Sequence, residues 1–496
     1  MTNDRELIQS PRWRADELGQ PIPESPHAVS VCLPTWRDNV GYEEGESRVV
    51  DALQTGYPRF VYPRLCRSLF GMCESRYAGS GESCLAFPTK PVADRFSDFM
   101  TRFGAKDLHD HSVGAFDVHA VVFPSTHAQL AKSYWQHTGE GVSSRLAEAC
   151  LQSTPKPDGS LAKQQIRQRI ADVAGVSADD VYLFPTGMNS VYMAHRVIRE
   201  THPDRKSIQF GFPYVDTLKI LEKFGAGSHF FPLGDDSSID QVGDLIAGES
   251  IAALFTEVPS NPLLNTPDLV RLSRLLREQS VPFIVDDTIA TIVNTDLLPI
   301  ADMVCSSLTK FFSGVGNVAG GSIILSPSSP NYRLFKTTLD RLYEDLVWDQ
   351  DAIELEANSR DFTERVQRIN ETTVKLVDFL DSHSSVDRVY HPTTIATANY
   401  DAVRKSDGGY SGLFSVLLKD AGNVSASFFD ALRLCKGPNL GTNYSLACPY
   451  TILAHYQELD FAESCGVSTH LIRVSAGLED VDDLINRFTD ALNAIR

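Results

Sequence analysis

The chain has 496 residues, of which 42% are hydrophobic and 22% charged, a composition typical of a globular protein with a large core. Its formal net charge is −19, from 45 basic and 64 acidic residues, which argues against binding to nucleic acids or anionic membranes, because both require basic surfaces. We see no apolar leader at the N-terminus and no apolar run of about 18 residues, so we expect no signal peptide and no membrane span.

The nine cysteines are spaced irregularly and form no CxxC pair. A zinc ribbon or a redox-active dithiol is therefore not expected. Scattered cysteines in odd number in a long chain indicate reduced thiols. We predict a cytoplasmic protein with no metal site.

The first part of the chain has no regular pattern. Residues 1–30 are polar and rich in proline, which predicts an N-terminal arm or a partly disordered segment. Residues 31–135 mix aromatic residues with many turn residues, and their pattern defines no architecture. We treat residues 1–135 as an N-terminal extension of the domains that follow.

From about residue 160, strand and helix patterns alternate. Short apolar segments predict strands at residues 181–185, 207–213, 251–259, 281–287, 301–308 and 320–326. Amphipathic segments predict helices at residues 161–175, 186–202, 216–225 and 267–280. Thr186 is the expected N-cap of the second helix, Gly225 ends the third, and Pro267 starts the fourth.

Strand–helix alternation predicts an α/β fold, with a large, mostly parallel sheet and helices on both of its faces, over residues 136–360. Residues 340–382 have the pattern of long helices. Residues 361–496 include three further strand patterns and predict a smaller α+β domain.

Three features lie where predicted strands end, which is where open α/β sheets bind their ligands. Gly187 opens the helix that follows one strand, in the segment PTGMNS, and a helix start with small residues can hold a phosphate. Asp286 ends the strand FIVDD, and Lys310 follows the strand ADMVCSSL. Each feature has a simpler interpretation: a plain turn, a helix cap, or a lysine whose amine reaches water.

Together, the three features predict a cofactor. A lysine that is taken out of water has a lowered pKa and can form a Schiff base. A carboxylate can pair with a protonated ring nitrogen, and a helix start can hold a phosphate. These are the parts that pyridoxal 5′-phosphate (PLP) requires. Asp286 lies 24 residues before Lys310, which leaves room for one crossover between neighbouring strands.

Several motifs resemble those of the trans-sulfuration, or Cys/Met metabolism, group of fold-type-I PLP enzymes, and most closely the fungal cystathionine γ-synthases. PTGMNS resembles SSGMAA, TEVPSNPLL resembles ESPSNPLL, and VDDTIAT resembles VDNTFAT. SSLTKFFSG is similar to the S-x-T-K-Y lysine motif, and LIRVSAGLEDVDDLI is similar to LRLSVGLED-x-x-DLI. The likeness covers the chain from about residue 140 to its end, and PHAVSVCLPTWRDNVGYE and TGYPRF resemble the fungal extension.

The resemblance implies roles for the cofactor-binding residues. Lys310 would form the Schiff base and then move protons, and Asp286 would pair with the pyridine nitrogen. Gly187 and Met188 would bind the phosphate through their N–H groups. The hydroxyl groups of Ser307 and Thr309 would assist them.

It also implies roles beside the cofactor ring. Tyr214 would stack on the ring and aid proton transfer, and Asn261 would lie near the phenolic oxygen. Arg473 would bind the substrate carboxylate, a task that suits a guanidinium group. The simpler alternatives are a core tyrosine, a turn residue before Pro262, and an arginine on a surface strand.

Three departures from the family pattern bear on the reaction. The family's Tyr-x-Arg phosphate clamp, which the neighbouring subunit donates, has no clean counterpart in HTGEGVSSR, where His137, Thr138 or Arg145 could substitute. Pro185 stands where relatives have serine. Asn439, in KGPNLGT, also replaces a serine, close to where the lysine and the substrate would meet, and we expect it to contact the substrate.

The resemblance implies a PLP-dependent γ-substitution on an O-acyl-L-homoserine, with cysteine as the nucleophile. One alternative is a specialised fungal γ-synthase of secondary metabolism that uses a carbon or other nucleophile, or a trans-sulfuration lyase. Another is a family member without catalytic activity, against which the intact Lys310, Asp286 and Arg473 argue. The expected partners are small amino-acid substrates and further copies of the chain, in a homodimer or homotetramer.

Overall fold

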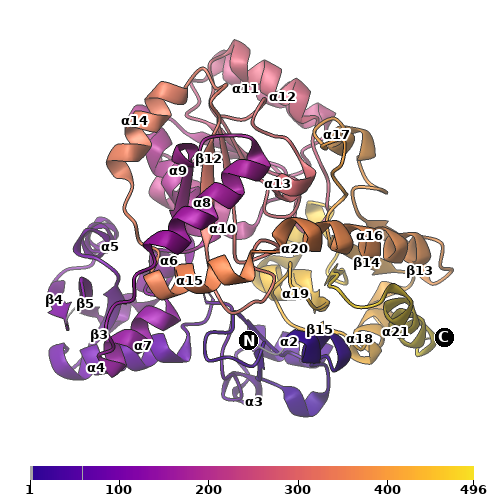
Figure 1. Ribbon diagram of the computed structural model, residues 1–496, viewed down its shortest axis with the longest axis horizontal. Coiled ribbons are helices and arrows are strands. Elements are labelled where there is room, and N and C mark those ends of the chain that lie inside the picture. Colours follow the sequence, from indigo (N-terminus) through magenta and orange to yellow (C-terminus); the bar gives the residue numbers. More distant parts are fainter. Residues whose placement is uncertain (1–3, 59, 115, 496) are drawn as a thin grey trace.

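The computed structural model describes residues 4–58, 60–114 and 116–495, which form three lobes (Figure 1). The upper lobe in that view contains the largest sheet with its covering helices. The lower left lobe comes from the N-terminal part of the chain, and the lower right lobe from the C-terminal part.

The largest sheet has seven strands in the order β6-β12-β11-β10-β9-β7-β8. Only β12 runs antiparallel to its neighbours, so the prediction of a mostly parallel sheet is confirmed. The strands are β6 (Val181–Phe184), β7 (Ser207–Phe210), β8 (Ser228–Phe231), β9 (Leu254–Glu257), β10 (Phe283–Asp286), β11 (Met303–Ser306) and β12 (Gly321–Leu325).

Helices bury both faces of this sheet. Along β10, Ile284 belongs to the core on one face and Val285 to the core on the other, because successive side chains of a strand point in opposite directions. The helices are α8 (Ser160–Ala174), α9 (Gly187–Thr201), α10 (Val215–Phe224), α11 (Asp236–Gly248), α12 (Leu269–Glu278), α13 (Thr291–Asn294), α14 (Tyr332–Leu342) and α15 (Asp349–Asn358).

Three local expectations need correction. Helix α12 begins after Pro267, because the Asp268 side chain accepts a hydrogen bond from the Arg271 N–H at 2.9 Å and so caps the helix. The helical pattern after residue 340 is interrupted, because α14 ends at Leu342 and α15 starts at Asp349. Strand β8 and helix α11 have no counterpart among the predicted elements.

The C-terminal lobe contains a five-stranded sheet in the order β13-β14-β17-β16-β15, which confirms the smaller α+β unit. Its strands are β13 (Val386–Tyr390), β14 (Leu413–Leu418), β15 (Cys435–Lys436), β16 (Leu446–Pro449) and β17 (Ile472–Ser475). Its helices are α16 (Phe362–Asp381), α17 (Thr397–Asp401), α18 (Ala421–Ala431), α19 (Tyr450–His455), α20 (Leu459–Ser464) and α21 (Val481–Asn493).

The N-terminal lobe has its own antiparallel sheet, in the order β3-β5-β4. Its strands are β3 (Glu82–Phe87), β4 (His109–Val113) and β5 (Val118–Pro124). The helices of this part are α4 (Arg64–Tyr77), α5 (Lys90–Arg102), α6 (Ala128–Thr138) and α7 (Ser144–Gln152). Helix α6 also packs against α9 and α10, so this lobe and the large sheet share one core.

The prediction of a polar arm at the N-terminus is wrong for the described residues. Ile22 and Cys32 are fully buried against Tyr444 and Leu446 of the C-terminal lobe. The Lys436 N–H donates to the Arg12 carbonyl oxygen at 3.0 Å. The elements of this segment are α1 (Asp4–Gln9), β1 (Pro21–Ile22), β2 (Ser30–Val31), α2 (Trp36–Glu43) and α3 (Ser47–Val50).

The predicted domain boundaries fall in different settings. Residue 135 lies within helix α6, whereas residue 360 lies between α15 and α16. The division into residues 1–135, 136–360 and 361–496 stays a prediction.

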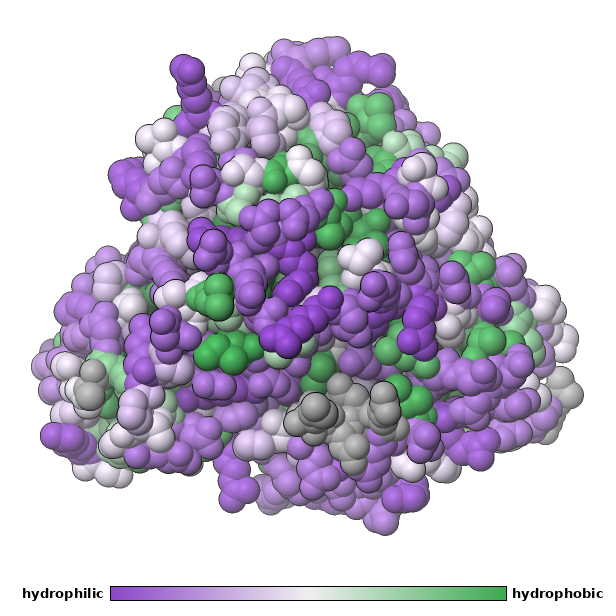
Figure 2. Space-filling view, viewed as in Figure 1, coloured by the Kyte–Doolittle hydropathy of each residue, from purple (hydrophilic) through white to green (hydrophobic). Residues whose placement is uncertain are grey.

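The face shown in Figure 2 is mostly hydrophilic, with small, separate hydrophobic patches. This is consistent with a chain in which 22% of the residues are charged. Within the described residues, no helix has the length and apolar character that crossing a membrane demands.

The docking of the N-terminal segment can be tested with Ile22→Ala. We expect this change to lower the free energy of unfolding by about 2–5 kcal/mol, because Ile22 is 0% exposed and its truncation leaves a cavity. The matched control is Leu161→Ala, at a side chain that is 65% exposed. Thermal unfolding and protease sensitivity measure both changes. Equal midpoints and equal cleavage rates in the two variants would show that this segment is not docked.

Candidate active site

One pocket lies at the carboxyl edge of the large sheet and collects residues from all parts of the chain. Strands β6, β7, β9, β10 and β11 run parallel, so the segments that follow them meet at this edge. The predicted site residues that line the pocket are Gly187, Met188, Tyr214, Asn261, Asp286, Ser307, Lys310 and Arg473.

The amine of Lys310 lies inside this pocket, and the residue is 8% exposed. The amine nitrogen donates a hydrogen bond to Asn439 Oδ1. It also lies 4.3 Å from the centroid of the Tyr57 ring, within the range of a cation–π contact. Both contacts orient the amine, and neither pairs it with a carboxylate.

Two carboxylates end neighbouring strands of the sheet and both line the pocket. Asp286 on β10 lies opposite Glu257 on β9 in the parallel register. Burial, together with the charge of Asp286, raises the pKa of Glu257 to about 8. Burial also raises the pKa of Asp286, although the Thr288 N–H donates to its carboxylate at 2.9 Å. A cation placed between these two groups would favour their ionised forms.

The start of helix α9 reaches the same pocket. The Thr186 side chain caps the helix by accepting a hydrogen bond from the Asn189 N–H at 3.0 Å. The first N–H groups of any helix have no partner inside the helix, so those of Gly187 and Met188 are suited to an anion. A Cβ at Gly187 would lie 2.5 Å from Ser307 Cβ, so only glycine allows the helix this close to the Ser307 turn.

Arg473 also lines the pocket, from the buried strand β17, and is 4% exposed. Its guanidinium donates to the carbonyl oxygens of Pro438 at 2.8 Å and Asn439 at 3.1 Å, and to Asn261 Oδ1 at 3.4 Å. These oxygens are neutral, so these contacts leave its charge available to a carboxylate ligand. The guanidinium also lies 4.9 Å from the centroid of the Tyr450 ring.

Two predicted site residues do not line the pocket. The Thr309 hydroxyl accepts from the Gly320 N–H at 3.1 Å and donates to the Gly320 carbonyl oxygen at 3.3 Å, so it stabilises the turn after Lys310. Asn439 is 1% exposed and acts on the site through Lys310. Its Nδ2 has no hydrogen-bond partner among the described residues.

The residues considered as substitutes for the phosphate clamp are engaged elsewhere. His137 Nδ1 lies 2.9 Å from Asp216 Oδ1, and the Thr138 hydroxyl donates to the Tyr134 carbonyl oxygen at 2.8 Å. Arg145 pairs with Asp351 at 3.1 Å.

Tyr57, Phe60 and Glu257 are among the pocket residues that were not predicted from the sequence. Glu257 was discoverable from the motif TEVPSNP, since it ends a strand just as Asp286 does. Tyr57 belongs to TGYPRF, whose residues Tyr57, Pro58 and Arg59 have the Tyr-x-Arg spacing of the clamp. Arg59 lies outside the described residues.

The pocket therefore has a distinct charge pattern: paired carboxylates, a helix start suited to an anion, a buried amine and an arginine. An anionic phosphate fits the helix start, and a protonated ring nitrogen fits the carboxylates whose pKa values are raised. A reactive aldehyde fits the Lys310 amine. These properties define a PLP enzyme of fold type I.

The comparison with protein families gives the same result. The chain belongs to the Cys/Met metabolism PLP-dependent enzyme family, whose model matches residues 158–493. Residues 65–143 match the N-terminal domain of fungal trans-sulfuration enzymes. The predicted family, enzyme class and cofactor are confirmed. The match at residues 65–143 also confirms that the extension resembles that of the fungal enzymes.

Individual relatives are similar over nearly the whole chain. A cystathionine gamma-synthase of Neurospora crassa is 37% identical over 96% of this chain and 98% of its own length. A cystathionine gamma-synthase-like enzyme of Amanita muscaria is 35% identical over 97% and 96%. The solved cystathionine gamma synthase of Xanthomonas oryzae pv. oryzae shares the fold, with a TM-score of 0.59 and 22% identity over 68% of this chain and 86% of that one.

The close approach at Gly187 leads to a prediction for Gly187→Ala. The added Cβ forces α9 and the Ser307 turn apart, so we expect PLP to bind at least about tenfold more weakly. The measurement is the PLP content after equilibrium dialysis, read from absorbance. Gly71→Ala is the matched control, because a Cβ at that helical position meets no atom within 4 Å. Unchanged PLP affinity in Gly187→Ala would contradict this account of the phosphate site.

A second prediction concerns Asp287, which is 0% exposed and adjacent to the pocket. Burial, with the charge of Asp286, raises the pKa of Asp287 to about 7. Between about pH 4 and pH 7 the folded state holds a proton that the unfolded state releases, so this carboxyl lowers stability as the pH rises. Asp287→Asn removes the penalty.

We therefore expect Asp287→Asn to stabilise the PLP-free protein at pH 8 and to have little effect at pH 4. Thermal midpoints at the two pH values measure the difference. Asp204→Asn, at an exposed position, is the control and should show no such trend. A stabilisation by Asp287→Asn that does not depend on pH would contradict the raised pKa.

Proposed function

We propose that this enzyme catalyses γ-substitution on an O-acyl-L-homoserine, with cysteine as the nucleophile and cystathionine as the product. The observation that carries the proposal is the convergence of Lys310, Asp286 and Arg473 on one pocket. The likeness to the enzyme named cystathionine gamma-synthase in Neurospora crassa, which extends over nearly the whole chain, supports the choice of reaction.

The side chains of the pocket have separate roles in this reaction. Bound PLP supplies an aldehyde that links to amines and a protonated ring that takes up electron density when a proton leaves the substrate. Asp286, with Glu257 opposite it on the adjacent strand, would hold the protonated ring nitrogen of the cofactor. Arg473 binds the substrate carboxylate with its guanidinium fork and so fixes the orientation of the substrate.

Lys310 is the base that removes protons from the substrate, first at Cα and then at Cβ. Its amine lies in the pocket, where Asn439 Oδ1 accepts a hydrogen bond from it. Tyr214 lines the same pocket and can aid the second transfer. The rings of Tyr57 and Phe60 close the pocket on one side and keep water away from the reacting atoms.

A second candidate function is a γ-substitution with a carbon or other nucleophile. Asn439 favours it, because this residue bonds the Lys310 amine at a position where the family motif has serine. Its Nδ2 is a buried donor that has no protein partner among the described residues. The amide therefore keeps an unused Nδ2 donor next to Lys310, whereas its Oδ1 already accepts from the Lys310 amine.

We also propose that the enzyme acts in the cytoplasm as a homodimer or homotetramer. Its nine cysteines are all free, which suits a reducing compartment. The family resemblance favours an oligomer with active sites near the subunit boundary.

The product of the reaction tests the proposal. We expect the purified enzyme to form cystathionine from O-acetyl- or O-succinyl-homoserine and cysteine, as measured by mass spectrometry. Lys310→Ala should lower the rate by about 10²–10⁴-fold or more, because it removes the general base and the covalent link. A carbon–carbon product from a β-keto acid, without cystathionine, would favour the second candidate, and no product from any pair would refute both.

A further inference from the structure

A second cleft, of about 490 Å³, lies between helix α5 of the N-terminal lobe and helix α9 of the large sheet. Arg95 and Arg102 reach it from α5, and Arg196 and Arg199 reach it from α9. Such a concentration of positive charge stands out in a chain whose net charge is −19.

Only one of these arginines is fully balanced by acids. Arg95 pairs with Glu140 at 2.7 Å and with Glu344 at 2.5 Å. Arg102 and Arg199 donate to the backbone carbonyls of the neighbouring α10 C-terminal turn, which are neutral. Burial, with the charge of Arg199, lowers the pKa of Arg102, as expected for two nearby cations.

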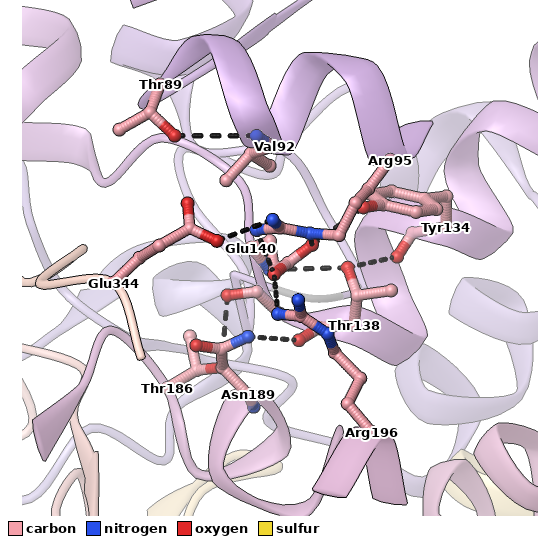
Figure 3. Close-up of polar contacts among 11 residues, drawn as sticks. Thr89, Val92, Arg95, Tyr134, Thr138, Glu140, Thr186, Asn189, Arg196 and Glu344 are labelled. Carbon is pink, nitrogen blue, oxygen red and sulfur yellow. Dashed lines mark hydrogen bonds and ion pairs between the residues drawn. The ribbon is translucent and has the colours of Figure 1, made fainter. Parts of the chain in front are cut away.

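Arg196 is half-buried and, within the described ranges, has only a long ion pair. Its nearest carboxylate is Glu140, at 4.0 Å, beyond hydrogen-bonding distance. Glu140 is already held by Arg95 and by the Tyr134 hydroxyl, which donates to it at 2.6 Å. Figure 3 shows Arg95 and Arg196 both directed at Glu140. One Arg196 nitrogen is buried and has no hydrogen-bond partner among the described residues.

The acids that line the cleft do not offset these charges. Glu200 pairs with Arg341 at 2.7 Å, and Asp98 is exposed. The apolar wall is aromatic: the Phe99 and Phe224 rings stack with their centroids 4.9 Å apart. The cleft is thus lined by several guanidinium groups and by an apolar wall of aromatic rings.

We propose that this cleft is a second anion-binding site, for a small molecule that carries phosphate groups, separate from the pocket around Lys310. Guanidinium groups match the paired oxygens of a phosphate, and a multivalent anion satisfies several of them at once. A single carboxylate would leave the other arginines unmatched. Inorganic phosphate and phosphate esters share this chemistry.

The cleft is connected to the pocket by a chain of contacts between α6 and α9. The Thr138 hydroxyl bonds the backbone of Tyr134, and Asn189 Nδ2 donates to the Thr138 carbonyl oxygen at 3.1 Å. The Asn189 N–H in turn bonds the Thr186 cap of α9 (Figure 3). An anion that draws Arg196 away from Glu140 acts on this network, which holds the helix start that is suited to the PLP phosphate.

The test is a calorimetric titration of the PLP-loaded enzyme with pyrophosphate at constant ionic strength. We expect one saturable site per chain. Arg196→Gln and Arg102→Gln should each raise the dissociation constant for pyrophosphate by about tenfold or more, since each variant loses a charge-assisted hydrogen bond. Arg388→Gln removes the same charge from an exposed position on β13 and should leave binding unchanged. Thermal midpoints show that each variant is folded.

The absence of saturable binding to the wild-type enzyme would overturn the proposal, and so would equal weakening in Arg388→Gln. The connection has its own readout, the rate of PLP release with and without saturating pyrophosphate. We expect the rate to change at least about threefold in the wild type and to stay constant in Arg196→Gln. An unchanged wild-type rate would overturn the connection. The main measurement is pyrophosphate binding, which does not depend on the proposed reaction. A failure of the anion-site proposal is therefore distinguishable from a failure of the proposed function.

Discussion

The active site depends on the placement of like charges side by side at one edge of a sheet. Asp286 and Glu257 end adjacent parallel strands, in register, where burial disfavours the ionised form of both. Two buried carboxylates on adjacent strands favour a cationic ligand over a neutral one. This edge of the sheet therefore favours a bound positive charge, and the protonated ring of PLP would supply one. The other contacts of the pocket orient that ligand.

The order of the strands explains how residues far apart in the sequence come together in this pocket. Strand β11 lies beside β10, so the turn that carries Ser307 and Lys310 follows directly beside Asp286. Strand β12 fills the gap between β11 and β6, and this brings the start of α9 against Ser307. The close packing of Gly187 on this turn then fixes the distance between the phosphate end and the amine end of the site.

Local pattern predicted the parts of the site that follow buried strands. Lys310, Asp286 and Gly187 are recognisable because an apolar run ends just before each of them. Tyr57 and Phe60 are not recognisable in this way, because their place in the pocket depends on how the N-terminal segment docks. Thr309 is the opposite case, because the motif predicted a hydroxyl that binds the cofactor phosphate. The geometry of the turn instead directs this hydroxyl to the backbone of Gly320. Strand β8 is only half-buried, so it lacks the apolar signal of the other strands.

The N-terminal extension is an integral part of the catalytic unit. Its first segment places the Tyr57 ring beside the Lys310 amine, and the lobe that follows packs on α9 through α6 and the buried Glu140, which is 0% exposed. The ion pair of Arg95 with the buried Glu140 is costly to break, because the Glu140 charge has no access to water. The first contact lies in the cofactor pocket, and the second lies beside the arginine cleft. The extension therefore shapes the pocket directly and also supports the helix on which the pocket is built.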